Sequence, residues 1–576
     1  LRVLGSFYAG LDFGKIVPVL DGLKYHMNFG PDYSNRRQGI YIDKSSAVRL
    51  GGTSYASLAL NRKFSWTLDN IITYDKIFGK NKVGLTLLQS ASRYNNETAS
   101  MSEVNVPKAS YLWNNMGAVD ITASTSSASM GSGLTESQLA SYMGRMNYSY
   151  FDRYLLTLSG RYDGSSVLAA GHKWAFFPSA ALGWRIEQEE FMQDQTLFDQ
   201  LKLRLGVGTT GNAAVSPYQT IGQVQSFYVP FGGSANALAY ATNEPYYTNT
   251  QVSLANPNLG WESTTQYNLG VDFSILKGRI AGTVDVYKSR TTDLLMDMVI
   301  PTLTGYPRTT ANVGETKNHG IDISLDFNPI RTKDFKWDMN INTAYQKDEI
   351  VLLANGKQDM IDNTWFIGQS ISVYYGLASN GLWNASEQEE MDKFNANGHT
   401  FSAGMVKPVD QNEDYKINSE DRVILGNQLP TWTLGLNNTF TYKNFELAFM
   451  LYGRFGYMIS TGGEGQLGMY QQRQIDYWTP ENTDAEWQKP IYSQSGGDPY
   501  SGLLGYRDAS FLKLRNVSLG YNLPAKTCKT IGIENMKIYA QAKNLGTIYS
   551  TVDWIDLDLG GSTFNRGWVI GLELGF

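Results

Sequence analysis

Oxygen-bearing side chains recur at short, regular intervals between residues 410 and 421. Calcium binds about six to eight oxygen ligands on a flexible loop, and an EF-hand loop supplies them from positions 1, 3, 5, 7, 9 and 12. The spacing therefore predicts a structural site for Ca²⁺ or a similar ion, which would tie down a long connection. The predicted ligands are the side chains of Asp410, Asn412, Asp414, Asn418 and Asp421 and the backbone carbonyl of Lys416.

Two positions of this loop depart from the EF-hand pattern. Position 12 is Asp421 where an EF-hand has Glu, and position 6 is Tyr415 where a sharp turn prefers glycine. The alternative interpretation is a solvated acidic loop in which Asn and Asp side chains form turns. The spacing favours the ion site, and the turn interpretation stays open.

Four aromatic residues in the same part of the chain are weak candidates for binding a sugar. Their rings could stack on the apolar faces of sugar rings. The alternative is that they pack inside the loop or against a partner protein. The candidates are Trp365, Tyr374, Tyr375 and Trp383.

The residues of common catalytic sites are absent or scattered. The four histidines lack the spacing of a shared site, and the sequence has no Gly-x-Ser-x-Gly, no phosphate-binding Gly-Lys-Ser/Thr loop and no His-Glu-x-x-His. Asp322 and Asp326 form a carboxylate pair, which we expect to be solvated or hydrogen-bonded on a strand. We predict that the protein is not an enzyme and has no catalytic cofactor. A polysaccharide hydrolase, the alternative, would need two carboxylates about 5–10 Å apart in a cleft.

Composition narrows the class of protein. The 576 residues are 42% hydrophobic, include a single cysteine, Cys528, and carry a formal net charge of −6. One cysteine excludes an internal disulfide, and the slightly acidic balance argues against a nucleic-acid partner. A helical membrane span needs a run of about 18 or more apolar residues, and the sequence contains no such run. A soluble chain of this length would normally show linkers between domains, and none is evident.

The elements that must position these residues are predicted to be strands. Large apolar residues alternate with small or polar ones, as strand side chains alternate between two faces. Aromatic residues such as Tyr154, Tyr162, Trp432 and Tyr442 mark the ends of the apolar faces, as in the girdles of membrane barrels. The pattern predicts an all-β fold and favours a transmembrane antiparallel β-barrel over a soluble β protein. It occurs at 154–162, 265–273, 321–327, 335–341, 432–440 and 564–576.

The connections between the predicted strands alternate between short and long. Short turns are expected near 276–279, 329–334 and 443–444. Outer-membrane barrels place short turns on the periplasmic side and long loops outside, so the long segments are predicted to be extracellular. We count roughly 16 to 18 candidate strands. The long segments lie at about 92–137, 210–260, 346–430 and 455–508.

Several short motifs follow one another in a fixed order from about residue 141 to the last strand. They include Arg161-Tyr162-Asp163-Gly164-Ser165-Ser166, Leu182-Gly183-Trp184-Arg185, Leu201-Lys202-Leu203-Arg204, Thr210-Gly211-Asn212, Asn256-Pro257-Asn258-Leu259-Gly260-Trp261-Glu262, Asn312-Val313-Gly314, Asn318-His319-Gly320 and Phe511-Leu512-Lys513-Leu514-Arg515-Asn516-Val517. In this order they resemble the SusC/RagA-type TonB-dependent transporters of Bacteroidetes outer membranes.

The resemblance implies a 22-stranded barrel in the outer membrane, plugged from inside and covered by a SusD-like surface lipoprotein. Such pairs import oligosaccharides or peptides with energy from the TonB complex, and the family suggests a dimer of transporter–lipoprotein pairs. The chain begins at Leu1 and not at Met. We expect the plug and the first strands to precede residue 1, so that residues 1–576 are the C-terminal part of the barrel. A soluble extracellular carbohydrate-binding β protein and a passive porin-like barrel stay as alternatives.

Overall fold

The structure is a computed structural model of the 576-residue chain. Phe564 and Phe576, which belong to the predicted terminal strand, lie outside the residues that it describes. The described residues are 1–49, 52–106, 109–119, 127–222, 224–231, 235–241, 243–244, 250–251, 253–462, 474–491, 497–560 and 565–575.

Nearly all regular structure in the described residues is β. Nineteen strands belong to one large sheet, and the two α-helices of this part of the chain are the short α1(Gln388–Ala396) and α2(Ala525–Thr530). Neither helix, nor any other in the described ranges, has the length and apolarity of a membrane span. The prediction of an all-β chain is confirmed.

The chain divides into two compact units, which are described separately. Unit 1 comprises Leu1–Trp184, Leu205–Tyr267 and Arg290–Glu315, and unit 2 comprises Arg185–Arg204, Asn268–Ser289 and Thr316–Phe576. Four long strands contribute one end to each unit, namely β9(Phe198–Asn212), β15(Glu262–Ile275), β16(Ile280–Val299) and β17(Arg308–Arg331).

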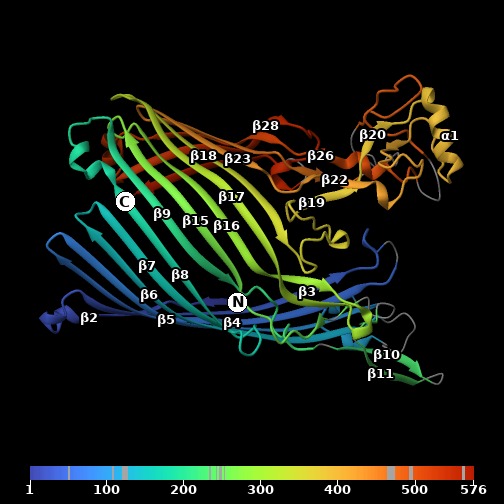
Figure 1. Ribbon diagram of the computed structural model, residues 1–576, viewed down its shortest axis with the longest axis horizontal. Coiled ribbons are helices and arrows are strands. Elements are labelled where there is room, and N and C mark those ends of the chain that lie inside the picture. The colour runs from blue at the N-terminus through green and yellow to red at the C-terminus, as the bar shows by residue number, and fades with distance from the viewer. Residues whose placement is uncertain are drawn as a thin grey trace. The chain divides into compact units, whose positions relative to one another are not determined.

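Unit 1 is built on a series of antiparallel neighbours (Figure 1). Each strand from β3 to β8 pairs with the next, and β1 and β2 both pair with β3. These strands are β1(Arg2–Leu4), β2(Phe7–Asp12), β3(Leu23–Ile42), β4(Tyr55–Phe78), β5(Asn81–Val104), β6(Ser129–Tyr150), β7(Tyr154–Ser165) and β8(Trp174–Arg185). Shorter strands follow as β10(Gln225–Phe231), β11(Ala235–Ala241), β12(Asn243–Glu244), β13(Thr250–Gln251) and β14(Ser253–Leu254).

Unit 2 repeats this antiparallel arrangement. β18, β23, β24, β27, β28 and β29 pair in that order. Their bounds are β18(Phe335–Leu352), β23(Trp432–Tyr442), β24(Phe445–Phe455), β27(Phe511–Asn522), β28(Asn535–Ser550) and β29(Gly567–Gly575). Smaller strands lie in the connections, namely β19(Val373–Leu377), β20(Ser379–Leu382), β21(Val406–Pro408), β22(Arg422–Asn427), β25(Met458–Ser460) and β26(Tyr506–Asp508).

The short turns join strands where the sequence predicts them. Residues 276–279 connect β15 to β16, and Lys443 and Asn444 connect β23 to β24. The turn between β6 and β7 has Phe151 and Asp152 in the left-handed region, each with φ of 56°. Lys82 on β5 pairs with the Asp152 carboxylate at 2.7 Å, which ties this turn to the neighbouring hairpin.

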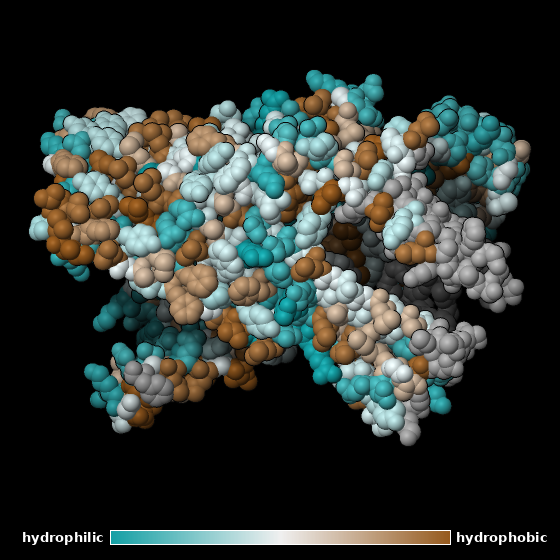
Figure 2. Space-filling model, turned by 90° about the horizontal axis from the view of Figure 1, so that it is seen from below, coloured by the Kyte–Doolittle hydropathy of each residue, from teal (hydrophilic) through white to brown (hydrophobic). Residues whose placement is uncertain are grey.

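The predicted alternation between faces is present in the strands. On β29, Trp568, Ile570 and Leu572 are 76%, 85% and 54% exposed. Figure 2 likewise shows hydrophobic residues at the surface in patches, separated by hydrophilic ones. The buried hydrophobic clusters of the described residues draw largely on the connections, whereas many large apolar residues of the described strands are exposed.

One predicted long segment has different bounds in the structure. The segment at 92–137 is largely strand, because β5 continues to Val104 and β6 begins at Ser129. The ladder persists there, with Ser102 opposite Ser129. Residues 95–102 are mostly polar or small, so alternation of hydrophobicity gives no strand signal although the backbone remains paired. The other long segments contain β10 to β14, β19 to β22 with α1, and β25 with β26.

Candidate functional site

Two of the long connections pack together into one structure, which we call the loop module (residues 373–427, 474–491 and 497–508). Within it β19 pairs with β22, and β20 pairs with β21. Figure 1 shows α1, β20 and β22 close together in this region of unit 2. The core of the loop module contains Trp383, Met391, Phe394, Phe401, Met405 and Ile417, with Ile491 and Tyr500 of the second connection packed against it.

Trp383 lies at the centre of this core. Its side chain is 0% exposed, and its ring packs against Phe394 and Phe401 with centroid distances of 5.8 and 5.5 Å. The Lys407 ammonium lies 4.3 Å from the Trp383 ring centroid. Buried in this way, the ring has no face available to a sugar, so the prediction for Trp383 is wrong and its contribution is to packing.

The Lys407 ammonium also joins helix α1 to the rest of the loop module. It lies 2.9 Å from the Glu387 carboxylate and 3.0 Å from that of Glu390. Desolvation alone would raise the pKa of Glu387, but the N–H of Asn384 and the Lys407 ammonium outweigh it and hold that pKa below its usual value. Desolvation would lower the pKa of Lys407, and its hydrogen bonds to the two carboxylates raise it instead.

The second connection is held by a buried carboxylate. Asp498 accepts the N–H of Val406 at 2.7 Å and the N–H of Tyr500 at 2.9 Å. Burial raises the pKa of the Asp498 carboxyl in spite of these two hydrogen bonds. Within the first connection, His399 Nε2 accepts the N–H of Ile417 at 3.0 Å.

The other three aromatic candidates are half-buried and packed among protein groups. Tyr374 packs edge-on against Tyr506, with ring centroids 5.3 Å apart, and its hydroxyl accepts the N–H of Ser460. Tyr375 packs against Phe366 at 4.8 Å. Trp365 forms a backbone bridge with Met360. Their role as sugar contacts remains a prediction.

The predicted ion-binding loop is wound by hydrogen bonds from its own backbone. The two oxygens of Asp410 accept the N–H groups of Glu413 and Tyr415, each at 2.8 Å. The two oxygens of Asp421, which is completely buried, accept those of Gln411 and Asn418. Glu413 and Tyr415 have φ values of 61° and 60°, so Tyr415 adopts the left-handed turn that position 6 requires.

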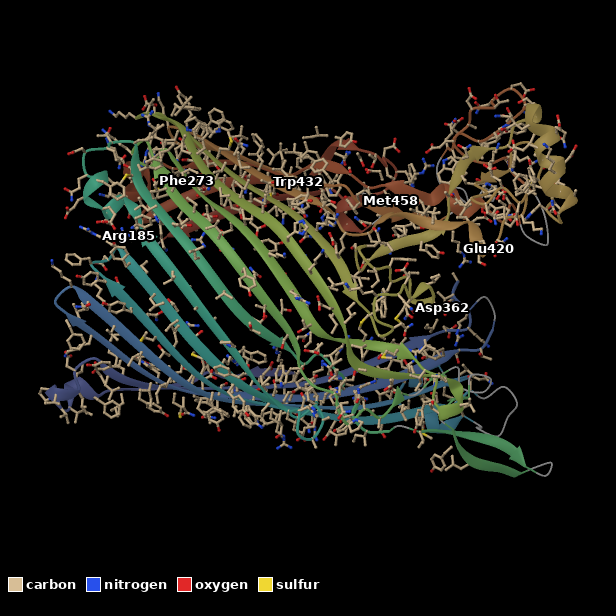
Figure 3. All side chains as sticks on the ribbon, viewed as in Figure 1. Arg185, Phe273, Asp362, Glu420, Trp432 and Met458 are labelled. Atoms are coloured by element: carbon tan, nitrogen blue, oxygen red, sulfur yellow. The ribbon has the colours of Figure 1, made fainter. Side chains whose placement is uncertain are left out.

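The fit of this loop to a cation is therefore partial. Asn412 and Asp414 direct side-chain oxygens to N–H groups two residues ahead, as in Asx turns. Among the described residues, no group of three or more His, Cys, Asp or Glu side chains is close enough to hold a metal ion. The loop has the turn geometry of the predicted site, and its carboxylates would have to converge on the ion. Glu420, which Figure 3 labels, belongs to the same loop, and its carboxylate accepts a hydrogen bond from the Asn412 side-chain amide at 3.2 Å.

A polar pocket of about 430 Å³ lies on a strand face of unit 2. It is lined on one side by Asp285, Asp322 and Ser324, and on the other by Asn342, Thr433 and Asn437. These positions alternate along their strands with the apolar Ile321, Ile323 and Leu434, so their side chains belong to the opposite face from the apolar one.

The charges around this pocket are organised by one arginine. Arg204 Nη2 lies 2.8 Å from Asp272 and 2.9 Å from Asp285. The remaining oxygen of Asp285, Oδ1, is buried and has no hydrogen-bond partner. Asp326, the predicted companion of Asp322, instead accepts a hydrogen bond from the Asn340 amide at 2.8 Å. The alternation along each strand predicts which residues lie on the polar face. It does not show which strands are neighbours, so the sequence did not predict this pocket.

Comparison with known proteins shows which family the chain is similar to. Residues 5–545 match the family described as "TonB dependent receptor-like, beta-barrel". The TonB-dependent receptor P26 of Formosa agariphila is 31% identical over 599 residues, which cover 100% of this chain and 57% of the relative. The TonB-dependent receptor SusC of Bacteroides thetaiotaomicron is 32% identical over 433 residues, covering 71% of this chain and 40% of SusC. The matched part of the chain therefore spans 57% of the length of the first relative and 40% of the length of the second.

Solved structures agree on the fold. A structure of the RagAB peptide transporter superposes with a TM-score of 0.79 at 21% identity, covering 100% of this chain and 62% of that one. This confirms the predicted barrel fold. The alternative of a soluble β protein, which the alternation had left open, is not supported. The family consists of outer-membrane proteins, so the apolar faces of the strands face lipid. The predicted resemblance to SusC and RagA is confirmed, and the chain belongs to the TonB-dependent receptor β-barrel family.

Proposed function

We propose that the chain forms the barrel part of a SusC-type nutrient importer that takes up oligosaccharides or peptides across the outer membrane. The observation that carries the proposal is the polar pocket of unit 2. Carboxylates, amides and hydroxyls line it together with apolar residues such as Ala344 and Met450, on the face opposite the lipid-facing one, where a solute would pass. Such groups can hydrogen-bond sugar hydroxyls or peptide groups alike.

We also propose the partners that the resemblance implies. A SusD-like surface lipoprotein would cover the end of the barrel that carries the long connections, where the loop module offers a packed surface. The TonB complex would supply the energy for uptake. Two transporter–lipoprotein pairs would form a dimer. Co-purification of the full-length protein from the outer membrane tests these partners, and an isolated monomer without a lipoprotein would contradict them.

Uptake by cells that carry the full-length protein tests the importer. Deleting its gene should abolish growth on the imported oligosaccharide or peptide. Restoring the gene with Asp285→Asn and Asp322→Asn should lower uptake at limiting concentration several-fold. The matched control is Asp326→Asn on the same strand, which lies outside the pocket and should behave as the wild type. Unchanged uptake after the deletion would overturn the importer, whereas a deletion phenotype with normal uptake by both variants would overturn only the role of the pocket.

Two further functions predict different results. The relatives described above are named as receptors and transporters, and we propose that this protein likewise does not change its cargo. Cargo recovered from the cell surface should have its original mass, whereas a hydrolase would return fragments. A passive porin would conduct ions continuously in a planar bilayer, while a gated importer of full length should conduct little until it is energised.

We propose that the loop from Asp410 to Asp421 binds Ca²⁺ as a structural ion. The support is the ligand spacing and the two left-handed turns at Glu413 and Tyr415. The six predicted ligands would be drawn inward around the ion. Ion binding would then hold this connection against the core of the loop module, to which Ile417 already belongs.

A further inference from the structure

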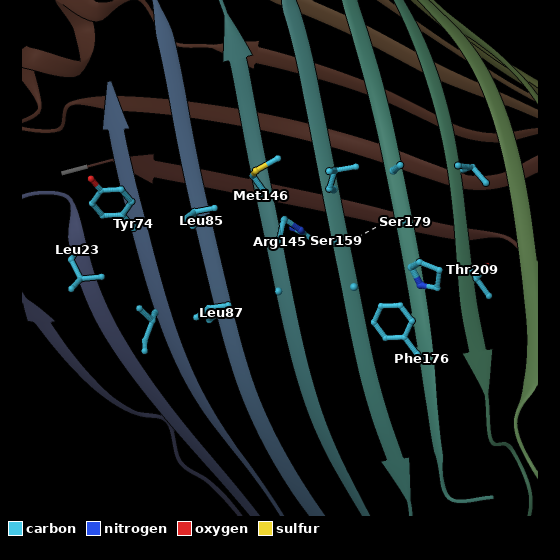
Figure 4. Close-up of a pocket in the computed structure, with 17 residues that line it drawn as sticks. Leu23, Tyr74, Leu85, Leu87, Arg145, Met146, Ser159, Phe176, Ser179 and Thr209 are labelled. Carbon is cyan, nitrogen blue, oxygen red and sulfur yellow. Dashed lines mark hydrogen bonds between the residues drawn. The ribbon is translucent and has the colours of Figure 1, made fainter. Parts of the chain in front are cut away.

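The lipid-facing side of unit 1 has a hollow that we call the apolar notch. Its floor is a row across four strands, in which Leu87 pairs with Gly144, Gly144 with Gly160, and Gly160 with Pro178. At Gly144 the missing side chain leaves the backbone uncovered, whereas neighbouring positions carry large side chains. The resulting cavity has a volume of about 820 Å³, and Figure 4 shows its lining residues on adjacent strands.

The two walls of the apolar notch differ in character. Met146, Leu158 and Ala180, which are in register, form one wall. The other wall is Phe176, which stands in register with Tyr162 and Tyr142 beyond the lining. The Phe176 ring lies over Gly160, where a Cβ would meet it at 2.7 Å.

No charge faces into the apolar notch from its floor. Arg145 and Ser159 occupy the alternate positions of β6 and β7, so their side chains belong to the opposite face of the sheet. The hydrogen bond between the hydroxyls of Ser159 and Ser179, at 2.6 Å, lies with them. Arg145, Ser159 and Ser179 border the cavity from that opposite face, and the Thr209 hydroxyl in the lining shares a hydrogen bond with that of Thr265 at 3.0 Å. The notch therefore favours an apolar occupant.

Aromatic rows place the apolar notch within the bilayer. Tyr150, Tyr154 and Trp184 form a row at the short-turn end of β6, β7 and β8. Tyr162 is eight residues further along β7, which at about 3.3 Å per residue and a tilt of roughly 40° is about 20 Å along the membrane normal. Trp174 stacks on Tyr162 with ring centroids 4.9 Å apart and thickens this second row.

These rows correspond to the two aromatic girdles of a membrane barrel, which flank an apolar band about 25 Å tall. The floor of the apolar notch lies two residues from Tyr142 and Tyr162, toward the first row. It is therefore inside the hydrocarbon layer, in the half nearer the long connections. Leu158 and Phe176, on either side of it, are 40% and 61% exposed.

We propose that the apolar notch is a binding site for one acyl chain of an outer-leaflet lipid. The notch is continuous with the lipid-facing surface, so a chain enters it without leaving the bilayer. It is also long enough to cross β4 to β9, since residues of all six strands line it. A bound chain would lie over Gly144, where the missing side chain leaves space, while the Phe176 ring already covers Gly160.

Filling the apolar notch with a side chain tests the proposal. In Gly144→Leu the new Cβ has its nearest neighbour, Leu87 Cδ2, at 3.7 Å, so the side chain can start from the floor without displacing backbone. Ala180→Phe fills the notch from the other wall and guards against failure of the first variant to fold. Ala140→Leu is the matched control, because it adds the same side chain on the same face of β6 outside the lining.

The full-length protein is purified, placed in nanodiscs with phospholipids brominated on the acyl chain, and analysed by native mass spectrometry after detergent exchange. We expect both filled variants to retain one lipid fewer than the wild type, and the control to retain the same number. Bromine quenching of Trp174, isolated by difference from Trp174→Phe, should fall at least twofold in the filled variants. Equal lipid retention in all variants would overturn the proposal. The proposal would also be overturned if a filled variant changed from a dimer to a monomer in the mass spectrum and kept the same number of lipids per chain.

Discussion

Lys513 on β27 and Asp556 in the connection before β29 form an almost completely buried ion pair, in which the two side chains are 1% and 2% exposed. Asp558 supports it, because its carboxylate lies 3.8 Å from the same ammonium and also pairs with Arg515. The pair fixes the last connection against the strand at a sequence distance of 43 residues.

Breaking this ion pair should be costly, and replacing it should not. Lys513→Met leaves Asp556 without its buried cation, while Asp558 keeps Arg515, so we expect unfolding to become easier by about 3–5 kcal/mol. Asp556→Asn should cost less, because Asp558 still faces the ammonium. The double variant Lys513→Met/Asp556→Leu should recover much of the loss. Denaturant unfolding of the full-length protein in detergent measures all three, and a double variant no better than Lys513→Met would contradict the role of charge.

Trp383 should hold the loop module together without affecting the strands. Trp383→Ala removes the ring at the centre of the core, at a cost of about 3–5 kcal/mol to the loop module. Limited proteolysis should then cut within residues 373–427, while the strand region stays resistant. Trp365→Ala is the control, because Trp365 is only half-buried. Equal protection in both variants would contradict the packing role.

The loop module should lose stability in acid through Glu387. A carboxyl whose folded pKa is below its unfolded value near 4.5 contributes stability above that value and loses it as the pH falls through the folded pKa. Asp498, with its raised pKa, acts in the opposite direction, so the comparison must be between variants. Between pH 7 and 3, hydrogen exchange in α1 should accelerate more in the wild type than in Glu387→Gln.

The control for this experiment is Glu389→Gln, which changes an exposed carboxylate in the same helix. It should keep the acid dependence of the wild type. Because the Glu387 side chain is 31% exposed, we expect a small effect, under about 1 kcal/mol. Identical pH profiles for Glu387→Gln and the wild type would show that the ion pair with Lys407 does not stabilise the helix.

Removing Ca²⁺ should loosen the loop from Asp410 to Asp421. With EDTA, we expect faster proteolysis in this loop and loss of terbium luminescence sensitised by Tyr415. Asp410→Asn should weaken terbium binding at least tenfold, since it removes a charged ligand. The exposed Glu413→Gln serves as the control and should bind as the wild type does. Terbium binding that is the same in Asp410→Asn would favour the solvated turn.

Prediction of strands from the sequence was most accurate where the structure depends on local geometry. Side chains alternate along any strand, so the ranges 154–162 and 432–440 predicted β7 and β23 directly. It was least successful at the ends of strands. Near Ser102 and Ser129 the ladder continues where both faces are polar, and hydrogen bonds between backbones leave no mark on composition.

The candidate site shows the same division. Spacing alone located the loop from Asp410 to Asp421, because its ligands are neighbours in sequence. Spacing could not show that Trp383 is buried, since its burial depends on Phe401, on Met405 and on Tyr500 from another connection. Asp285 was missed for the same reason, because only strand pairing brings it to Asp322.

The sequence by itself determined that this chain is a set of amphipathic strands with a family-specific order of motifs, because a two-residue period recurs wherever one face of a strand is apolar. The tertiary structure decided which distant segments meet. It buried Lys513 against Asp556, packed two long connections into one loop module and set Gly144 beside Gly160. These contacts depend on strand register and on the folding of long connections, and neither leaves a periodic signal in the sequence.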